Sequence, residues 1–168
     1  MANTFIQIGS VTVGSGGAAT MDFTSIPATY TDLLLVCSSR TASVASIDNL
    51  VIKPNGATTS QTAIRLQGTG SAAASSTATS FPPVNNAATS TASTFTSTQI
   101  YFPNYSGSTN KSLSIDNVQE DNAATAYAQM WAGLWSSTAA ISSINLATSS
   151  GSNFVQHSTA TLYGIKKN

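Results

Sequence analysis

Hydrophobic and polar residues alternate along most of this chain with a period of two, the spacing of a β-strand that is buried on one face. Residues 111–118 show the pattern clearly, because Leu113 and Ile115 alternate with Ser112, Ser114 and Asp116. Several short strands at such spacing are typical of a sandwich or barrel. We therefore expect nine or ten strands and no convincing helix, with the strands over residues 5–13, 19–25, 32–40, 50–53, 63–67, 96–102, 111–118, 126–135, 140–146 and 155–165.

Residues 68–94 interrupt this pattern with a run of glycine, serine, alanine, threonine and asparagine. Only Phe81-Pro82-Pro83-Val84 breaks the run. A structureless segment of this length is unusual in a compact domain and tends to be functional or mobile. The sequence leaves two alternatives: a loose surface loop, or an arm that becomes ordered against a neighbouring subunit with Phe81 or Val84 as its anchor.

Two of the expected strands are apolar on both faces, although a two-layer sandwich needs only one apolar face per strand. The first, residues 32–37, alternates Leu33, Leu35 and Cys37 with Leu34 and Val36. In residues 126–135, one face carries Tyr127, Trp131 and Trp135, and the other carries Met130 and Leu134. Because tryptophan is enriched at interface centres, the sequence favours Trp131, Trp135 and Tyr127 as subunit-interface residues. The alternative is coverage of this face by residues 68–94 of the same chain.

Composition narrows the function classes further. Serine and threonine make up roughly three residues in ten, only 7% of residues are charged, and the net charge is zero. About a quarter of the residues of an average soluble domain are charged, so this surface has little electrostatic protection against association. The few lysines and arginines are scattered and form no phosphate-binding stripe, which argues against nucleic acid as a partner. The chain is long enough for one domain over residues 1–168, and no stretch approaches the length of a membrane span.

The residues that carry most enzyme chemistry are scarce. Cys37 is the only cysteine and lies in an apolar run, where we expect a buried and unreactive thiol. His157 is the only histidine, and no nucleophile-elbow motif accompanies it. One histidine and one cysteine give no zinc spacing, and no other cofactor motif is present. Asp22 and Asp116 could serve as paired carboxylates for glycoside hydrolysis, but their spacing does not single them out.

Sugar binding without hydrolysis is a further alternative. Tyr101 and Tyr105 flank Pro103-Asn104 near the end of an expected strand, where a binding loop would lie. Exposed aromatic rings beside asparagine and serine are common in glycan-binding faces. These two tyrosines are therefore the candidate glycan contacts, and ordinary packing at a strand end is the competing interpretation.

Three segments of the chain resemble a known family. They are residues 5–13 (FIQIGSVTV), residues 23–36 (FTSIPATYTDLLLV) and residues 160–166 (ATLYGIK), about 18% of the sequence. Together they resemble small jelly-roll virion proteins of tailed bacteriophages, notably of cyanobacterial and marine hosts. The relatives of this kind include head decoration or cement proteins, head fibres, and tail-fibre or baseplate modules. They are commonly trimeric, and the family has no catalytic motif to transfer.

The sequence therefore predicts a single jelly-roll-like antiparallel β-sandwich with one long loop at residues 68–94, and no enzymatic activity. The resemblance implies a location on the surface of a virion assembled in the host cytoplasm. We expect a homotrimeric decoration protein that contacts the major capsid protein or other virion proteins. The alternative is a tail-fibre or baseplate module that binds a host-surface glycan.

Overall fold

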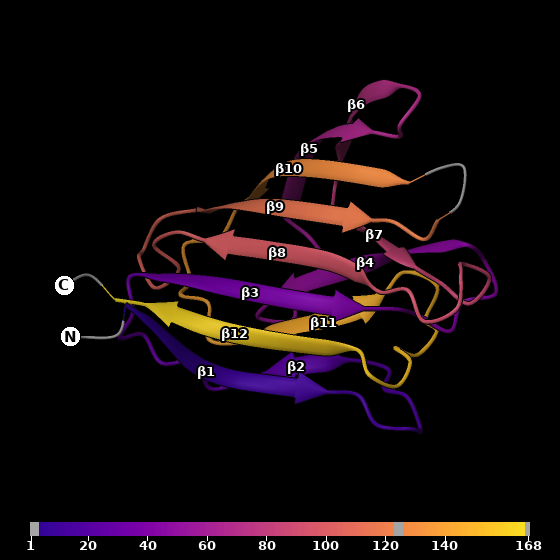
Figure 1. Ribbon diagram of the computed structural model, residues 1–168. Coiled ribbons are helices and arrows are strands. Elements are labelled where there is room, and N and C mark those ends of the chain that lie inside the picture. The colour runs from indigo at the N-terminus through magenta and orange to yellow at the C-terminus, as the bar shows by residue number, and fades with distance from the viewer. Residues whose placement is uncertain (1–3, 123–125, 167–168) are drawn as a thin grey trace.

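A computed structural model describes residues 4–122 and 126–166 of the chain (Figure 1). These residues form twelve β-strands and no helix. The strands are β1 (Phe5–Thr12), β2 (Met21–Phe23), β3 (Asp32–Ser39), β4 (Ile47–Pro54), β5 (Gln61–Gly68), β6 (Ala73–Ala78), β7 (Val84–Asn86), β8 (Thr96–Phe102), β9 (Lys111–Gln119), β10 (Tyr127–Trp135), β11 (Ile144–Thr148) and β12 (Thr159–Ile165).

The strands form two antiparallel sheets. The large sheet has the order β1-β12-β3-β8-β9-β10-β5-β6, and the small sheet has the order β2-β11-β4-β7. The small sheet lies behind one part of the large sheet in Figure 1, and the β5–β6 hairpin projects beyond it at the top. The chain is therefore an all-β, jelly-roll-like sandwich, as the sequence predicted.

The alternation of side chains explains how the core forms between the sheets. Along β9 every second residue is buried, and Leu113 and Ile115 point inward while Ser112 and Ser114 face solvent. β3 and β12 contribute Leu33, Leu35 and Leu162 to the same core, and the small sheet contributes buried residues such as Leu50, Ile52 and Leu146. Burying large aliphatic side chains stabilises a fold by roughly 1.5–3 kcal/mol each. One continuous apolar layer thus joins the two sheets.

The prediction of a long loop over residues 68–94 is wrong. The chain reverses direction at Thr69, whose N–H donates to the Ala72 carbonyl at 2.9 Å, and Gly70 adopts a positive φ of 84°. It then pairs as β6 with β5, and after a short connection it pairs as β7 with β4. Alanine, serine and threonine give little alternation of apolar and polar residues, so the sequence pattern does not indicate these strands. They form because their backbones pair with β5 and β4.

The last part of this segment is also held by its own chain. The buried guanidinium of Arg40 donates from Nη1 to the Thr91 carbonyl at 2.7 Å and from Nη2 to the Ser90 carbonyl at 2.9 Å. It also reaches the carbonyls of Thr94 at 3.1 Å and Ala88 at 3.2 Å. One side chain therefore satisfies four backbone acceptors, and the turn after β7 is built around it.

Candidate interaction surface

The two tryptophans predicted at a subunit interface are buried inside the chain itself. Trp131 and Trp135 both face the inner side of β10, where they belong to the hydrophobic core. The Trp131 indole donates from Nε1 to the Gln129 Oε1 at 3.1 Å, and the Arg65 guanidinium carbon lies 5.3 Å from the indole centroid. The interface assignment of these two residues is corrected accordingly, because no indole face is left for a partner.

The inner face of β10 is covered by residues 68–94 of the same chain, which was the alternative to a subunit interface. Phe81 is completely buried, and its ring lies 2.8 Å from the position that a Cβ would take on Gly133, between the two indole-bearing positions of β10. Val84 is also buried, and its N–H donates to the Gln129 Oε1 at 3.2 Å. Phe81 and Val84 are therefore anchors within one chain rather than between subunits.

The remaining interface candidate, Tyr127, begins β10 and is half-buried. It lies beside Ala128, whose side chain points to the outer face of the large sheet. Tyr127 is thus the one member of the predicted set that reaches the surface.

The two tyrosines proposed as glycan contacts are not equivalent. Tyr105 is fully buried, and its hydroxyl donates to the Pro27 carbonyl and accepts the Tyr30 N–H at 3.4 Å. Burial raises the pKa of Tyr105. As a ring inside the core it cannot stack on a sugar, so its prediction as a glycan contact is wrong. The chain turns toward the core at this point, and the sequence pattern did not indicate that turn.

Tyr101 does reach the outer face of β8. Its hydroxyl donates to the Asp32 Oδ2 at 2.8 Å, and this hydrogen bond to the carboxylate raises the pKa of Tyr101. The other oxygen, Oδ1, accepts the Asn104 N–H at 2.8 Å. Both oxygens of the Asp32 carboxylate are therefore hydrogen-bonded, and they attach the end of β8 and the β8–β9 connection to β3.

The groups considered for catalysis are dispersed. Asp22 faces outward from the small sheet, whereas Asp116 faces outward from the large sheet, so the sandwich separates them. Burial raises the pKa of the Cys37 thiol to about 11, as expected for an unreactive cysteine. His157 is exposed in a turn with a φ of 72°. Among the described residues, no group of three histidine, cysteine or acidic side chains could hold a metal ion.

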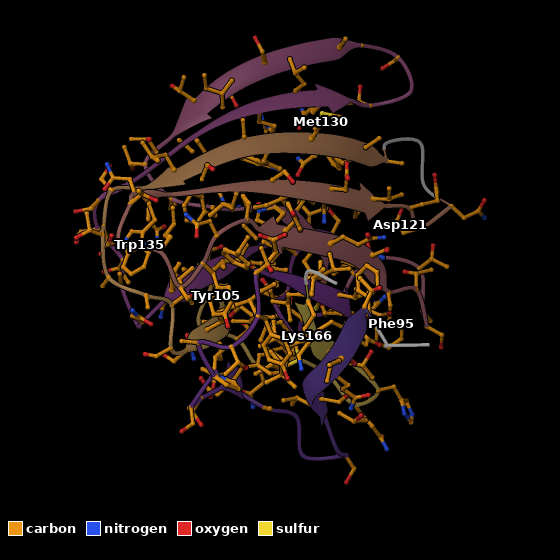
Figure 2. The ribbon with its side chains drawn as sticks, turned by 90° about the vertical axis from the view of Figure 1, so that its left-hand side faces the viewer. Phe95, Tyr105, Asp121, Met130, Trp135 and Lys166 are labelled. Atoms are coloured by element: carbon orange, nitrogen blue, oxygen red, sulfur yellow. The ribbon has the colours of Figure 1, made fainter. Side chains whose placement is uncertain are left out.

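The most distinctive surface lies on the outer side of β9, β10, β5 and β6, and we refer to it as the apolar face. Five of the seven exposed large hydrophobic residues of the described chain lie there, with exposed fractions of 61% for Met130, 60% for Leu66, 58% for Ile64, 54% for Val118 and 37% for Leu134. Cross-strand register places Met130 opposite Leu66 and Val118 opposite Ala128. Figure 2 shows Met130 on the upper part of the molecule, near the β5–β6 hairpin and away from Lys166.

The apolar face is hollowed rather than flat. One hollow of about 680 Å³ is lined mainly by Leu66, Ala73, Val118, Ala128 and Met130. A second hollow of about 740 Å³ lies alongside it and is lined by Ile64, Ala132 and Leu134 with neighbouring threonines. The strong twist of a β-sheet produces a concave trough of this kind. The arrangement has the shape and chemistry of a binding surface for an apolar partner, with no catalytic constellation beside it.

Sequence reasoning found half of the apolar face. It identified Met130 and Leu134 as a second apolar side of β10 that needed a cover. It missed Ile64 and Leu66, because residues 63–67 were predicted only as a short strand, with no side assigned to the core. In the structure Arg65 lies on the inner side against Trp131, and Ile64 and Leu66 face outward.

Comparisons with known proteins give no assignment. No protein-family model matches the chain, and no curated protein or solved structure resembles it closely enough to count as a match. A search of the described residues for a helix long and apolar enough to cross a membrane also found none.

Proposed function

We propose that this chain is a non-enzymatic structural protein of a tailed-phage particle, and specifically an oligomeric decoration or cement protein on the capsid exterior. The observation that carries the proposal is the large apolar face on a sandwich with very few charged residues. Monomeric proteins rarely expose large contiguous apolar patches, so such a face marks an interaction site. The resemblance of residues 5–13, 23–36 and 160–166 to virion proteins supplies the setting.

In this role the protein stabilises the head through repeated contacts. An oligomer, which we expect to be a trimer, would sit across junctions between subunits of the major capsid protein. Each copy adds a small buried area, and linked copies bind with a far higher avidity than a single one. A charge-poor surface suits permanent packing, because its contacts depend little on the ionic strength outside the particle.

The alternative of a glycan-binding tail module has weaker support. Two tyrosines suggested glycan binding. Of these, Tyr105 is buried in the core, and the hydroxyl of Tyr101 donates a hydrogen bond to Asp32. The apolar face is aliphatic, whereas sugar-binding faces use aromatic rings and paired polar groups.

Cryo-electron microscopy of purified particles tests the proposal directly. We expect density for the sandwich on the head exterior, with roughly hundreds of copies per particle in a quantitative gel, as a lattice-wide multivalent coat requires. A location on the tail, or a few tens of copies or fewer, would contradict the decoration role. Protein that remains on the heads through a wash in about 1 M salt would support apolar attachment.

A further inference from the structure

We propose that the apolar face is the surface through which copies of this chain associate, so that its occupant is the same face of another copy. This inference identifies the contact behind the oligomer in the proposed function, and it rests on that function only for the biological setting.

The orientation of β5 is the first observation. Its outward residues Ile64 and Leu66 are mostly exposed, while Arg65 on the inward side packs over the Trp131 ring at 5.3 Å. In a sheet whose outer side meets water, the aliphatic residues would face the core and the arginine would face solvent. The outward orientation of Ile64 and Leu66 on β5 becomes favourable when a partner covers the outer side of the sheet.

The apolar face supplies more than half of the area that a stable interface needs. Four strands about 4.8 Å apart and eight residues long at about 3.3 Å per residue span roughly 500 Å² before side-chain corrugation. Stable interfaces bury about 800 Å² on each partner. The half-buried outer side chains of the adjoining strands, Tyr101 on β8 and Leu34 and Val36 on β3, extend the same face toward that figure.

Charge selects a second copy over an unrelated partner. Asp116 is the only ionisable group among the outward-facing side chains of the four strands. A partner of average composition would bring about a quarter charged residues to this surface and would have to desolvate many of them. This chain has 7% charged residues and no net charge, so a contact between two copies of the face brings in no charged groups except the Asp116 carboxylate of each copy. The edge strand β6 likewise has no charged residue or proline, the usual protection of an exposed edge.

The face offers both exposed side chains and hollows to a second copy. It combines protruding side chains, Met130 and Leu66, with hollows of about 680 and 740 Å³ on the same surface. A protruding side chain of one copy can therefore fill a hollow of another. Across a twofold axis the face would meet itself directly, whereas around a threefold axis one part of the face would meet a different part of the same face on the next copy.

The test compares the assembly state of purified full-length variants. Met130→Lys and Leu66→Lys each place a charge in the centre of the apolar face. Val44→Lys is the matched control, because Val44 is 93% exposed and lies outside this face. Mass is measured by sedimentation velocity and light scattering from about 1 to 100 µM, which spans the affinities of ordinary specific complexes. Circular dichroism verifies that each variant is folded, and Met130→Leu serves as the conservative substitution.

We expect the wild-type protein, Val44→Lys and Met130→Leu to form the same oligomer. Both charged variants at the apolar face should weaken association by about 100-fold or more while remaining folded. A wild-type protein that is monomeric at about 100 µM would overturn the inference, as would an undiminished oligomer in both charged variants. If the wild type is monomeric and the charged variants fail to bind virus particles, the face belongs to a virion protein instead. An assembled protein that is absent from particles would refute the proposed function and leave this inference standing.

Discussion

Replacing Phe81 by alanine tests whether residues 68–94 fold onto their own chain. The Phe81 side chain is completely buried, and its ring lies against Gly133 and Leu113 on the inner side of the large sheet. No other residue of the segment fills so much of this space, because its other members are mainly alanine, serine and threonine. The substitution should therefore open a cavity beside β10 and loosen the connection between β6 and β7.

The expected loss of stability follows from the size of the buried ring. Replacing a buried phenylalanine by alanine costs about 3–5 kcal/mol, which combines lost transfer free energy with the cavity that remains. In a domain of this size each kcal/mol shifts Tm by about 2–4 °C, so a decrease of about 10 °C is expected. The emission of the tryptophans should also move to longer wavelength, because water gains access to the inner side of β10.

Urea unfolding followed by tryptophan fluorescence measures both effects, with Val44→Ala as a control that should change stability by less than about 0.5 kcal/mol. The measurement is repeated at two protein concentrations that differ by about 100-fold. Contacts within one chain give a loss of stability that is independent of concentration, whereas an anchor between subunits gives one that depends on it. A loss below about 1 kcal/mol, or one confined to high protein concentration, would refute the packing described for Phe81.

Three further predictions concern other parts of the fold. An alanine Cβ at Gly164 would lie 2.6 Å from Tyr30 Cδ1, so Gly164→Ala should lower the stability measured by thermal unfolding by about 1–3 kcal/mol. A Cβ at Gly68 would meet no atom within 4 Å, so Gly68→Ala should be neutral or stabilising. Equal stability of the two variants would contradict the close packing of Gly164 against Tyr30. Arg40→Met should cost about 3 kcal/mol and speed amide hydrogen exchange across residues 88–94, because four carbonyls each lose the hydrogen bond from the guanidinium. Unchanged exchange in this segment would argue against that role. The pKa of the Cys37 thiol rises from 9.0 to about 11 on folding, so above pH 9 the thiolate forms first in the unfolded chain. The free energy of unfolding of the wild type, compared with that of Cys37→Ala, should therefore be constant below pH 9 and fall by about 2–3 kcal/mol by pH 11. A difference that does not change with pH would show that the thiol is not buried.

Several elements could be predicted from the sequence because the spacing of neighbouring apolar residues is enough to indicate them. Strands β3, β9 and β10 match the expected ranges closely, since each has several large apolar residues spaced two positions apart. The sandwich followed from the number and spacing of such segments. The burial of Cys37 was equally readable, because its apolar neighbours indicated it.

The candidate site was only partly readable. The period of two showed that Met130 and Leu134 share one side of β10, opposite Trp131 and Trp135. It could not show which of the two sides faces the core. The sequence argument expected the indoles at the interface, and the structure places the aliphatic side there instead.

By itself the sequence determined the β class, the scarcity of charged residues and the apolar character of both sides of β3 and β10. The tertiary structure alone decided which side of each strand meets the core, since that choice depends on the register with neighbouring strands. It also decided that Phe81 covers the inner side of β10 and that Ile64, Leu66 and Met130 lie together on the outer side. The physical reason is that a strand's alternation fixes two faces, while only the packing of the whole sheet assigns one of them to the interior.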